Sequence, residues 1–148
     1  MIQSDFELRD ATNEDAHPIA SLLTELGYPT DAAAVPGRIA AVLAHGGAVL
    51  LAVAPDGPPL GVMCLDRHFA LHAAAPIAYI TALVISQPAR RRGVGRALVA
   101  AAKEWAIRQG ALEFLSRARN IAPTLTHSIP RVAFHTLGDV SRRLFRRP

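Results

Sequence analysis

Apolar residues recur with two different periods along the first three quarters of the chain, and these periods predict its elements. A helical spacing of three to four residues links Ala16, Ile19, Ala20, Leu23 and Leu26, and Gly27 ends the run. Thr12 or Asn13 precedes this run and is suited to cap the helix. A second helix is predicted over residues 32–44, with Pro36 tolerated only in its first turn.

Strands are predicted where apolar residues alternate with polar ones or form short continuous runs. A first strand covers residues 6–10, and a hairpin pairs residues 48–54 with residues 60–70 across the turn "PDGPP". Residues 77–85, "IAYITALVI", are apolar at nearly every position, which is typical of a central strand that is covered on both faces.

A long helix and one further strand follow the central strand. The helix is predicted over residues 94–109, with Gly110 as its cap, and "ALEFL" at residues 111–115 reads as a fifth strand. One apolar stripe of the helix is predicted to face the core, formed by Val94, Leu98, Ala101 and Trp105. After Leu115 the chain shows no clean period and is interrupted by prolines and arginines.

Composition narrows the class of protein. A chain of 148 residues, 51% hydrophobic, is long enough to bury the core of one domain. It contains no apolar run of roughly 18 residues and no signal-peptide pattern at its start, so we expect a cytoplasmic protein without a membrane span. The single cysteine, Cys64, excludes an internal disulfide and a cysteine-rich zinc site, and no metal is expected.

Positive charge is concentrated in the last quarter of the chain. Residues 1–110 carry nine basic and ten acidic side chains, whereas residues 111–148 carry seven arginines against Glu113 and Asp139. A basic tail of this kind is compatible with nucleic-acid binding or with a solvated arm.

Candidate chemistry lies between the central strand and the long helix, in "ARRRGVGR" at residues 89–96. A helix start already carries partial positive charge, so cations there cost some tenths of a kcal/mol each, roughly, unless an anion offsets them. A strand that runs through a glycine turn into a helix is the usual geometry for binding phosphate with backbone N–H groups. The loop matches neither the Walker A pattern nor the dinucleotide fingerprint, and a merely solvated arginine cluster remains an alternative.

The order of these elements, with R-x-x-G-x-G after the central strand, resembles the GNAT superfamily of N-acetyltransferases. The resemblance covers residues 5–114, and Arg90, Gly93 and Gly95 match the signature Q/R-x-x-G-x-G/A. It implies a single α/β (α+β) domain over residues 1–148, in the order β-α-α-β-β-β-α-β. The central sheet would be mixed but mostly antiparallel and flanked by helices, with the elements of the tail, residues 115–148, left unassigned.

The resemblance also implies acetyl-CoA as cofactor and a set of binding residues. Backbone amides of the loop would hold the pyrophosphate, and the residues so assigned are Arg90, Arg91, Arg92, Gly93, Val94, Gly95 and Arg96. Leu83 and Val84, continued by Ile85, would pair with the pantetheine arm, and an N–H group of Leu83 or Val84 would polarise the thioester carbonyl. The strand after the long helix would splay away to leave room for the cofactor.

Two positions depart from the family pattern. Many relatives carry a glutamate where this chain has Thr81, so the general base would be water or another side chain, with His68 and His72 as candidates by position. Relatives usually supply a tyrosine as general acid from a helix after the fifth strand. The tail contains none, since the only tyrosines are Tyr28 and Tyr79.

A shifted reading frame would account for the atypical tail. Between Ala118 and Ile129 the permitted codons in that frame include A-E-H-R-A-D-A-H-A-F-Y, which restores the missing tyrosine. The shift would begin between about Glu113 and Ser116, and the coding DNA decides the hypothesis.

Three functions are therefore open. The first is transfer of acetyl from acetyl-CoA to a primary amine, whose identity among small amines, amino acids, antibiotics and protein N-termini is not specified. The second is coenzyme A binding with impaired catalysis. The third, ranked last, is nucleic-acid binding through the tail. The tail lacks aromatic residues spaced for base stacking, since its only aromatic residues are Phe134 and Phe145. Many relatives pair through their C-terminal strands, so the resemblance also admits a homodimer.

Overall fold

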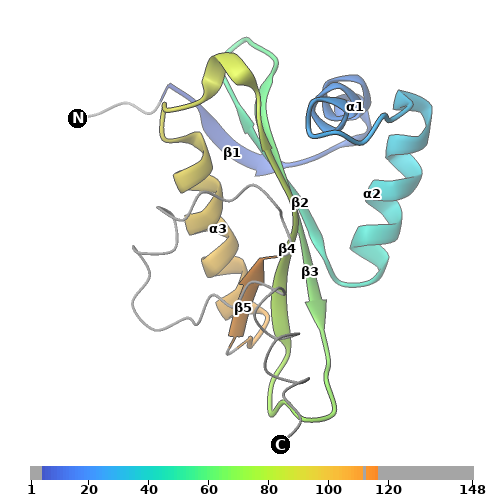
Figure 1. The fold of residues 1–148 in the computed structure, drawn as a ribbon, viewed down its shortest axis with the longest axis vertical. Coiled ribbons are helices and arrows are strands. Elements are labelled where there is room, and N and C mark those ends of the chain that lie inside the picture. The colour runs from blue at the N-terminus through green and yellow to red at the C-terminus, as the bar shows by residue number, and fades with distance from the viewer. Residues whose placement is uncertain (1–4, 112, 117–148) are drawn as a thin grey trace, which may run out of the picture.

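A twisted five-stranded sheet forms the centre of the computed structural model, which describes residues 5–111 and 113–116 (Figure 1). The strands lie side by side in sequence order, and all neighbours are antiparallel except the last pair. They are β1 (Glu7–Asp10), β2 (Ala48–Val53), β3 (Pro59–His68), β4 (Ile77–Ile85) and β5 (Glu113–Ser116). This confirms the predicted mixed, mostly antiparallel sheet and its element order.

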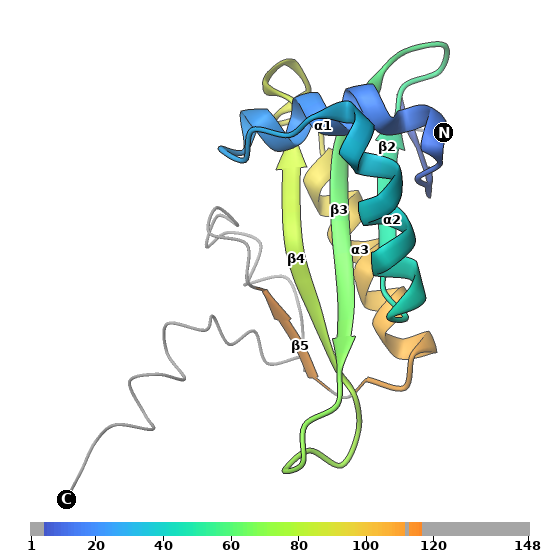
Figure 2. The same ribbon diagram turned by 90° about the vertical axis from the view of Figure 1, so that its right-hand side faces the viewer.

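Helices cover both faces of the sheet. The long helix α3 (Val94–Arg108) lies on one face, and α1 (Ala16–Glu25) and α2 (Val35–Ala44) lie on the other (Figures 1 and 2). The predicted helix over residues 32–44 is divided, because a 3₁₀ turn at Ala32–Ala34 precedes α2. Pro36 lies in the first turn of α2, where a missing N–H removes no helix bond.

Side chains from the two faces of the sheet fill two separate core layers. Ile80 on β4 packs with Leu98 and Trp105 of α3, while Val84 on the same strand packs with Ile19 and Ile39 of α1 and α2. The double coverage explains why β4 is apolar at almost every position. The α3 stripe differs from the prediction at one place, since Ala102 is fully buried and Ala101 only partly.

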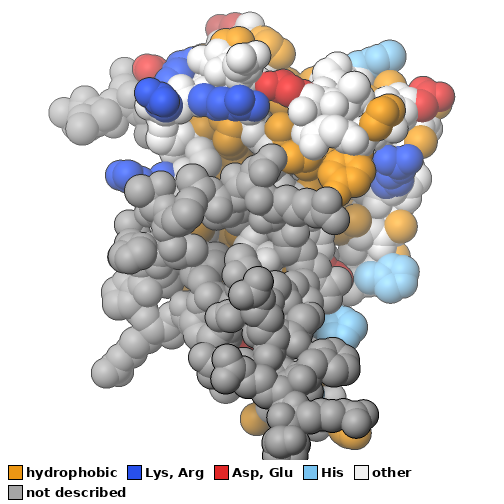
Figure 3. Space-filling model, viewed as in Figure 1, with side chains coloured by type: hydrophobic (Ala, Val, Ile, Leu, Met, Phe, Trp, Pro, Cys, Tyr) orange, Lys and Arg blue, Asp and Glu red, His pale blue; other side chains and the backbone are white. Residues whose placement is uncertain are grey.

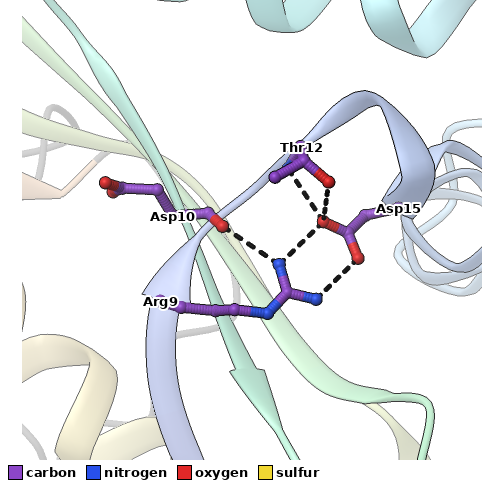
Figure 4. A network of polar contacts seen from close by, with 4 residues as sticks. All are labelled: Arg9, Asp10, Thr12 and Asp15. Atoms are coloured by element: carbon purple, nitrogen blue, oxygen red, sulfur yellow. Dashed lines mark hydrogen bonds and ion pairs between the residues drawn. The ribbon is translucent and has the colours of Figure 1, made fainter.

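A polar network fixes the connection from β1 to α1 (Figure 4). Arg9 donates two hydrogen bonds of 2.8 Å to the carboxylate of Asp15, and the backbone N and hydroxyl of Thr12 donate to the same carboxylate. Thr12 is therefore the cap of the first 3₁₀ turn, Asn13–Asp15, as one of the two predicted candidates. The Arg9 hydrogen bonds lower the pKa of Asp15 to about 2 against the opposing effect of burial.

The atypical tail predicted after residue 114 falls mostly outside the described residues, which end at Ser116. No helix in the described ranges is long and apolar enough to cross a membrane.

Candidate active site

The loop between β4 and α3 turns sharply through left-handed backbone. After the 3₁₀ turn Gln87–Ala89, Arg91 has φ of 62° and Gly93 has φ of 82°. Gly93 caps α3 in this conformation, and the next residue enters the helix. A non-glycine residue with positive φ is uncommon and costs of order 1 kcal/mol, and such strain is typical of ligand-binding loops.

Backbone amides at the start of α3 are left open. Among the described residues, no hydrogen-bond acceptor meets the N–H groups of Arg91, Arg92, Gly93, Val94, Gly95 and Arg96. The first helical hydrogen bond runs from the N–H of Ala97 to the carbonyl of Gly93, at 3.0 Å. A Cβ atom built on Gly93 would meet nothing within 4 Å, so the loop is also sterically open.

The four arginines of the loop have different surroundings. Arg90 donates to Glu25 and to the carbonyl of Ile85, and Arg92 lies 3.7 Å from Asp5. Arg91 and Arg96 are exposed and form no ion pair within the part of the chain that the structure describes. Basic side chains thus gather at this end of α3 (Figure 3), and Arg91 and Arg96 have no acidic partner among the described residues.

This donor set fits a diphosphate. Open N–H groups at a helix start, an αL glycine followed directly by helical backbone, and uncompensated cations are the features that bind phosphate oxygens. The residues that fit a diphosphate are those from Arg91 to Arg96, which were assigned to cofactor binding. The guanidinium of Arg90 instead donates to Glu25 and to the carbonyl of Ile85, and its assignment to cofactor binding stays a prediction.

Thr81 is the extra residue of a bulge in β4. Cys64 of β3 pairs with Ala82, whereas Leu65 pairs with Ile80, which leaves Thr81 without a cross-strand partner in β3. Its exposed side chain donates a 3.2 Å hydrogen bond to the carbonyl of Cys64. Bulges bend a strand and redirect its side chains, and they are over-represented next to active sites.

Beyond this bulge the far edge of β4 has no described partner. The parallel pairing with β5 runs from Ile77 and Glu113 to Ile80 and Ser116, where the described part of β5 ends. Leu83 and Val84 therefore lie in the stretch of β4 predicted to pair with pantetheine. Leu83 packs on the α3 side and Val84 is buried on the other side. Their roles stay predictions, as does the splaying of the fifth strand.

The remaining candidates lie on the β3–β4 hairpin. His68 is exposed and packs edge-on against Tyr79, with ring centroids 6.3 Å apart, and His72 is exposed in the connecting loop. Tyr79 is a buried residue of β4, as predicted, and Cys64 is partly buried, which raises the pKa of its thiol. No metal-ligating cluster of three or more His, Cys, Asp or Glu side chains occurs within residues 5–111 and 113–116.

Sequence reasoning missed one residue of this site, Glu25. It lies at the end of α1, and its carboxylate reaches the loop more than sixty residues farther along the chain. Nothing in the local pattern of α1 distinguishes Glu25 from a solvated helix residue.

Comparison with known proteins shows the family to which the chain belongs. The profile of the acetyltransferase (GNAT) family matches residues 10–131. Aminoglycoside N(6')-acetyltransferase type 1 of Klebsiella aerogenes is 39% identical over 110 residues, which are 72% of this chain and 70% of that protein. The chain belongs to the GNAT acetyltransferase family.

Solved structures of acetyltransferases share its fold. An acetyltransferase of Trypanosoma brucei matches with a TM-score of 0.73 at 17% identity, over 89% of this chain and 97% of that one. The aminoglycoside 6'-N-acetyltransferase of Acinetobacter haemolyticus matches with a TM-score of 0.64 at 18% identity, over 96% of this chain and 91% of that one. The GNAT protein is therefore an acyltransferase of the N-acetyltransferase type, as the sequence resemblance implied.

Proposed function

We propose that this GNAT protein transfers an acetyl group from acetyl-CoA to a primary amine. The observation that carries the proposal concerns the described part of the chain: the amides from Arg91 to Arg96 have no acceptor there, and the side chains of Arg91 and Arg96 form no ion pair there. A diphosphate offsets both the helix dipole and these side chains, which answers why the chain places so much positive charge at a helix start.

The exposed edge of β4 supplies the rest of the proposed site. Acetyl-CoA supplies an activated thioester, and the backbone N–H of Leu83 or Val84 donates to the carbonyl oxygen on which negative charge develops. Thr81 cannot act as a general base at neutral pH, so when a neutral acceptor amine attacks the thioester carbon, water or another side chain takes its proton. The C–S bond then breaks, and coenzyme A leaves as a thiolate that takes up a proton. The hydroxyl of Thr81 instead ties the bulge to β3.

For the acceptor, we propose an amino sugar bearing an amine of the aminoglycoside 6' type. The support is the 39% identity to an aminoglycoside N(6')-acetyltransferase over most of both chains. Other small amines are the comparison set in the experiment.

The test combines calorimetry with turnover. Acetyl-CoA is expected to bind the wild type, and Arg91→Gln and Arg96→Gln each weaken binding by about three- to tenfold, which corresponds to a net loss of about 0.6–1.4 kcal/mol for a solvent-exposed hydrogen bond. Arg108→Gln, at the other end of α3, is the control and leaves affinity unchanged. Absence of acetyl-CoA binding by the wild type would overturn the proposal.

A second candidate, coenzyme A binding with impaired catalysis, is favoured by Thr81 in the bulge and by the lack of a tyrosine after Tyr79. Release of free thiol from acetyl-CoA in the presence of an aminoglycoside and amine panel separates the two candidates. Binding without turnover for every amine would favour the second.

A further inference from the structure

The carboxylate of Glu25 cross-links the end of α1 to the base of the β4–α3 loop. One oxygen, Oε1, accepts from the backbone N of Gln87 at 3.0 Å and from Nη2 of Arg90 at 3.3 Å. Arg90 also donates from Nε to the carbonyl of Ile85, at 3.2 Å. Glu25 and Arg90 therefore span the loop from the last residue of β4 to the end of its 3₁₀ turn.

These contacts divide the loop into two halves with opposite character. In residues 86–90, backbone hydrogen bonds run from Ser86 to Leu60, from Ala89 to Ser86 and from Arg90 to Gln87, in addition to the Glu25 contacts. In residues 91–96, the amides have no acceptor among the described residues. The first half is anchored to the protein, and the second half is free to receive a ligand.

Glu25 is the last residue of α1 and directly precedes the segment that connects α1 to α2. Directly before it, the hydroxyl of Thr24 accepts from the N–H of Thr30, and Tyr28 between them is 60% exposed. The Glu25 carboxylate thus joins the loop that carries the open amides to the end of α1, from which the α1–α2 loop leads at the same end of the sheet (Figure 2).

We propose that Glu25 is a positioning residue that, through Gln87 and Arg90, holds the open amides in the arrangement that binds the diphosphate of coenzyme A. The inference rests on the proposed function. In it, Arg90 acts on the loop and not on the ligand. A loop that is correctly arranged for only a fraction of the time binds with an affinity reduced by that fraction, so loss of the cross-link lowers affinity without removing any group that touches the ligand.

The sign of the effect distinguishes positioning from simple electrostatics. Removing a negative charge beside an anion site strengthens anion binding if only Coulomb interactions matter. The cross-link predicts the reverse for Glu25. Asp5 offers a matched control, because its carboxylate also lies beside a loop arginine, at 3.7 Å from Arg92. Unlike Glu25, it accepts no hydrogen bond from the loop among the described residues.

The experiment measures binding of coenzyme A and of S-acetylpantetheine, which lacks the nucleotide diphosphate, to wild type and variants by calorimetry. Glu25→Ala is expected to weaken coenzyme A on the order of tenfold, in the range of coupling within a contact network, and to leave S-acetylpantetheine unchanged. Asp5→Asn binds coenzyme A as tightly as wild type or more tightly. Adding Arg90→Ala to Glu25→Ala produces little further loss, because both act on one cross-link.

The outcomes separate the inference from the function beneath it. If wild type does not bind coenzyme A, the proposed function fails. If wild type binds but Glu25→Ala binds equally or more tightly, the positioning role is overturned while the function stands. Equal weakening of both ligands also overturns it, since general destabilisation does not discriminate between them. Glu25→Gln, which keeps an oxygen for the N–H of Gln87, is the folded companion variant and is expected to fall between wild type and Glu25→Ala.

Discussion

At the scale of single residues, Asp15 is the most strongly perturbed carboxylate among the described residues. It is buried, and it accepts from the Arg9 guanidinium and from Thr12. Because its pKa falls from 3.8 to about 2 on folding, its ionised form stabilises the native state. The contribution is complete above about pH 5 and is lost as the pH falls toward 2, and it amounts to about 1–2 kcal/mol given that Arg9 is partly exposed.

Asp15→Asn is therefore expected to lower the free energy of unfolding by about 1–2 kcal/mol at pH 7, and the difference from wild type shrinks as the pH approaches 2. Urea denaturation at pH 7, 5 and 3 measures it. Glu14→Gln, at the exposed neighbouring position, is the control and stays within about 0.5 kcal/mol of wild type. A difference that is constant with pH would show that the Asp15 charge is not its source.

Substitution of Gly95 is expected to change the stability of the fold and the affinity for acetyl-CoA in opposite directions. A Cβ at Gly95 would lie 3.7 Å from Cγ1 of Ile85, an ordinary contact, and helical backbone favours alanine over glycine by about 0.5–1 kcal/mol. Gly95→Ala is thus expected to stabilise the apoprotein while weakening acetyl-CoA, because the added methyl occupies the space beside the open amides.

Gly37→Ala is the matched control for that variant. Gly37 lies exposed in the first turn of α2 with no atom within 4 Å of a built Cβ. It gains similar stability with no change in affinity, as thermal unfolding and calorimetry would show. Unchanged acetyl-CoA affinity in Gly95→Ala would place the ligand elsewhere.

At the scale of elements, the bulge in β4 places the Thr81 hydroxyl where the family resemblance implies a glutamate. Thr81→Val is expected to change kcat/KM for acetyl transfer by less than about threefold, because a threonine hydroxyl cannot serve as base. Thr81→Glu is expected to raise kcat/KM at neutral pH by about tenfold or more, since general-base catalysis typically contributes that much or more. Rates from pH 6 to 9 test both variants, and a large loss in Thr81→Val would contradict the assignment.

Elements that depend on local periodicity were predictable, and contacts between distant elements were not. The helices, the hairpin and the doubly covered β4 follow from the spacing of apolar residues such as Ile19, Leu98 and Ile80. The 3₁₀ turn before α2 and the bulge at Thr81 arise from hydrogen bonding that the apolar pattern does not record. Glu25 was missed for the same reason, because its partners lie on another element.

At the scale of the whole molecule, the excess of positive charge belongs to the tail and not to the proposed site. The cations of the proposed site, Arg91 and Arg96, belong to the part of the chain with a net charge near zero, while the excess of arginine lies beyond residue 110. The frame-shift hypothesis for that tail remains a proposal, and the family profile extends to residue 131. Sequencing the coding DNA between the codons of Glu113 and Ser116 tests it.

Ligand binding at the loop should be visible in the stability of the whole chain. Acetyl-CoA at one hundred times its dissociation constant stabilises a protein that binds it by about 2.7 kcal/mol. For a chain of this length, that raises Tm by roughly 5–11 °C. In the proposed site, Arg91 and Arg96 attract the diphosphate electrostatically. Raising the salt concentration from about 0.05 to about 0.5 M shortens the screening length about threefold, so it should reduce the Tm shift measured at fixed ligand concentration. S-acetylpantetheine, which has no diphosphate, should give a smaller shift that salt leaves unchanged. A salt-independent shift with acetyl-CoA would mean that its diphosphate is not bound by this loop.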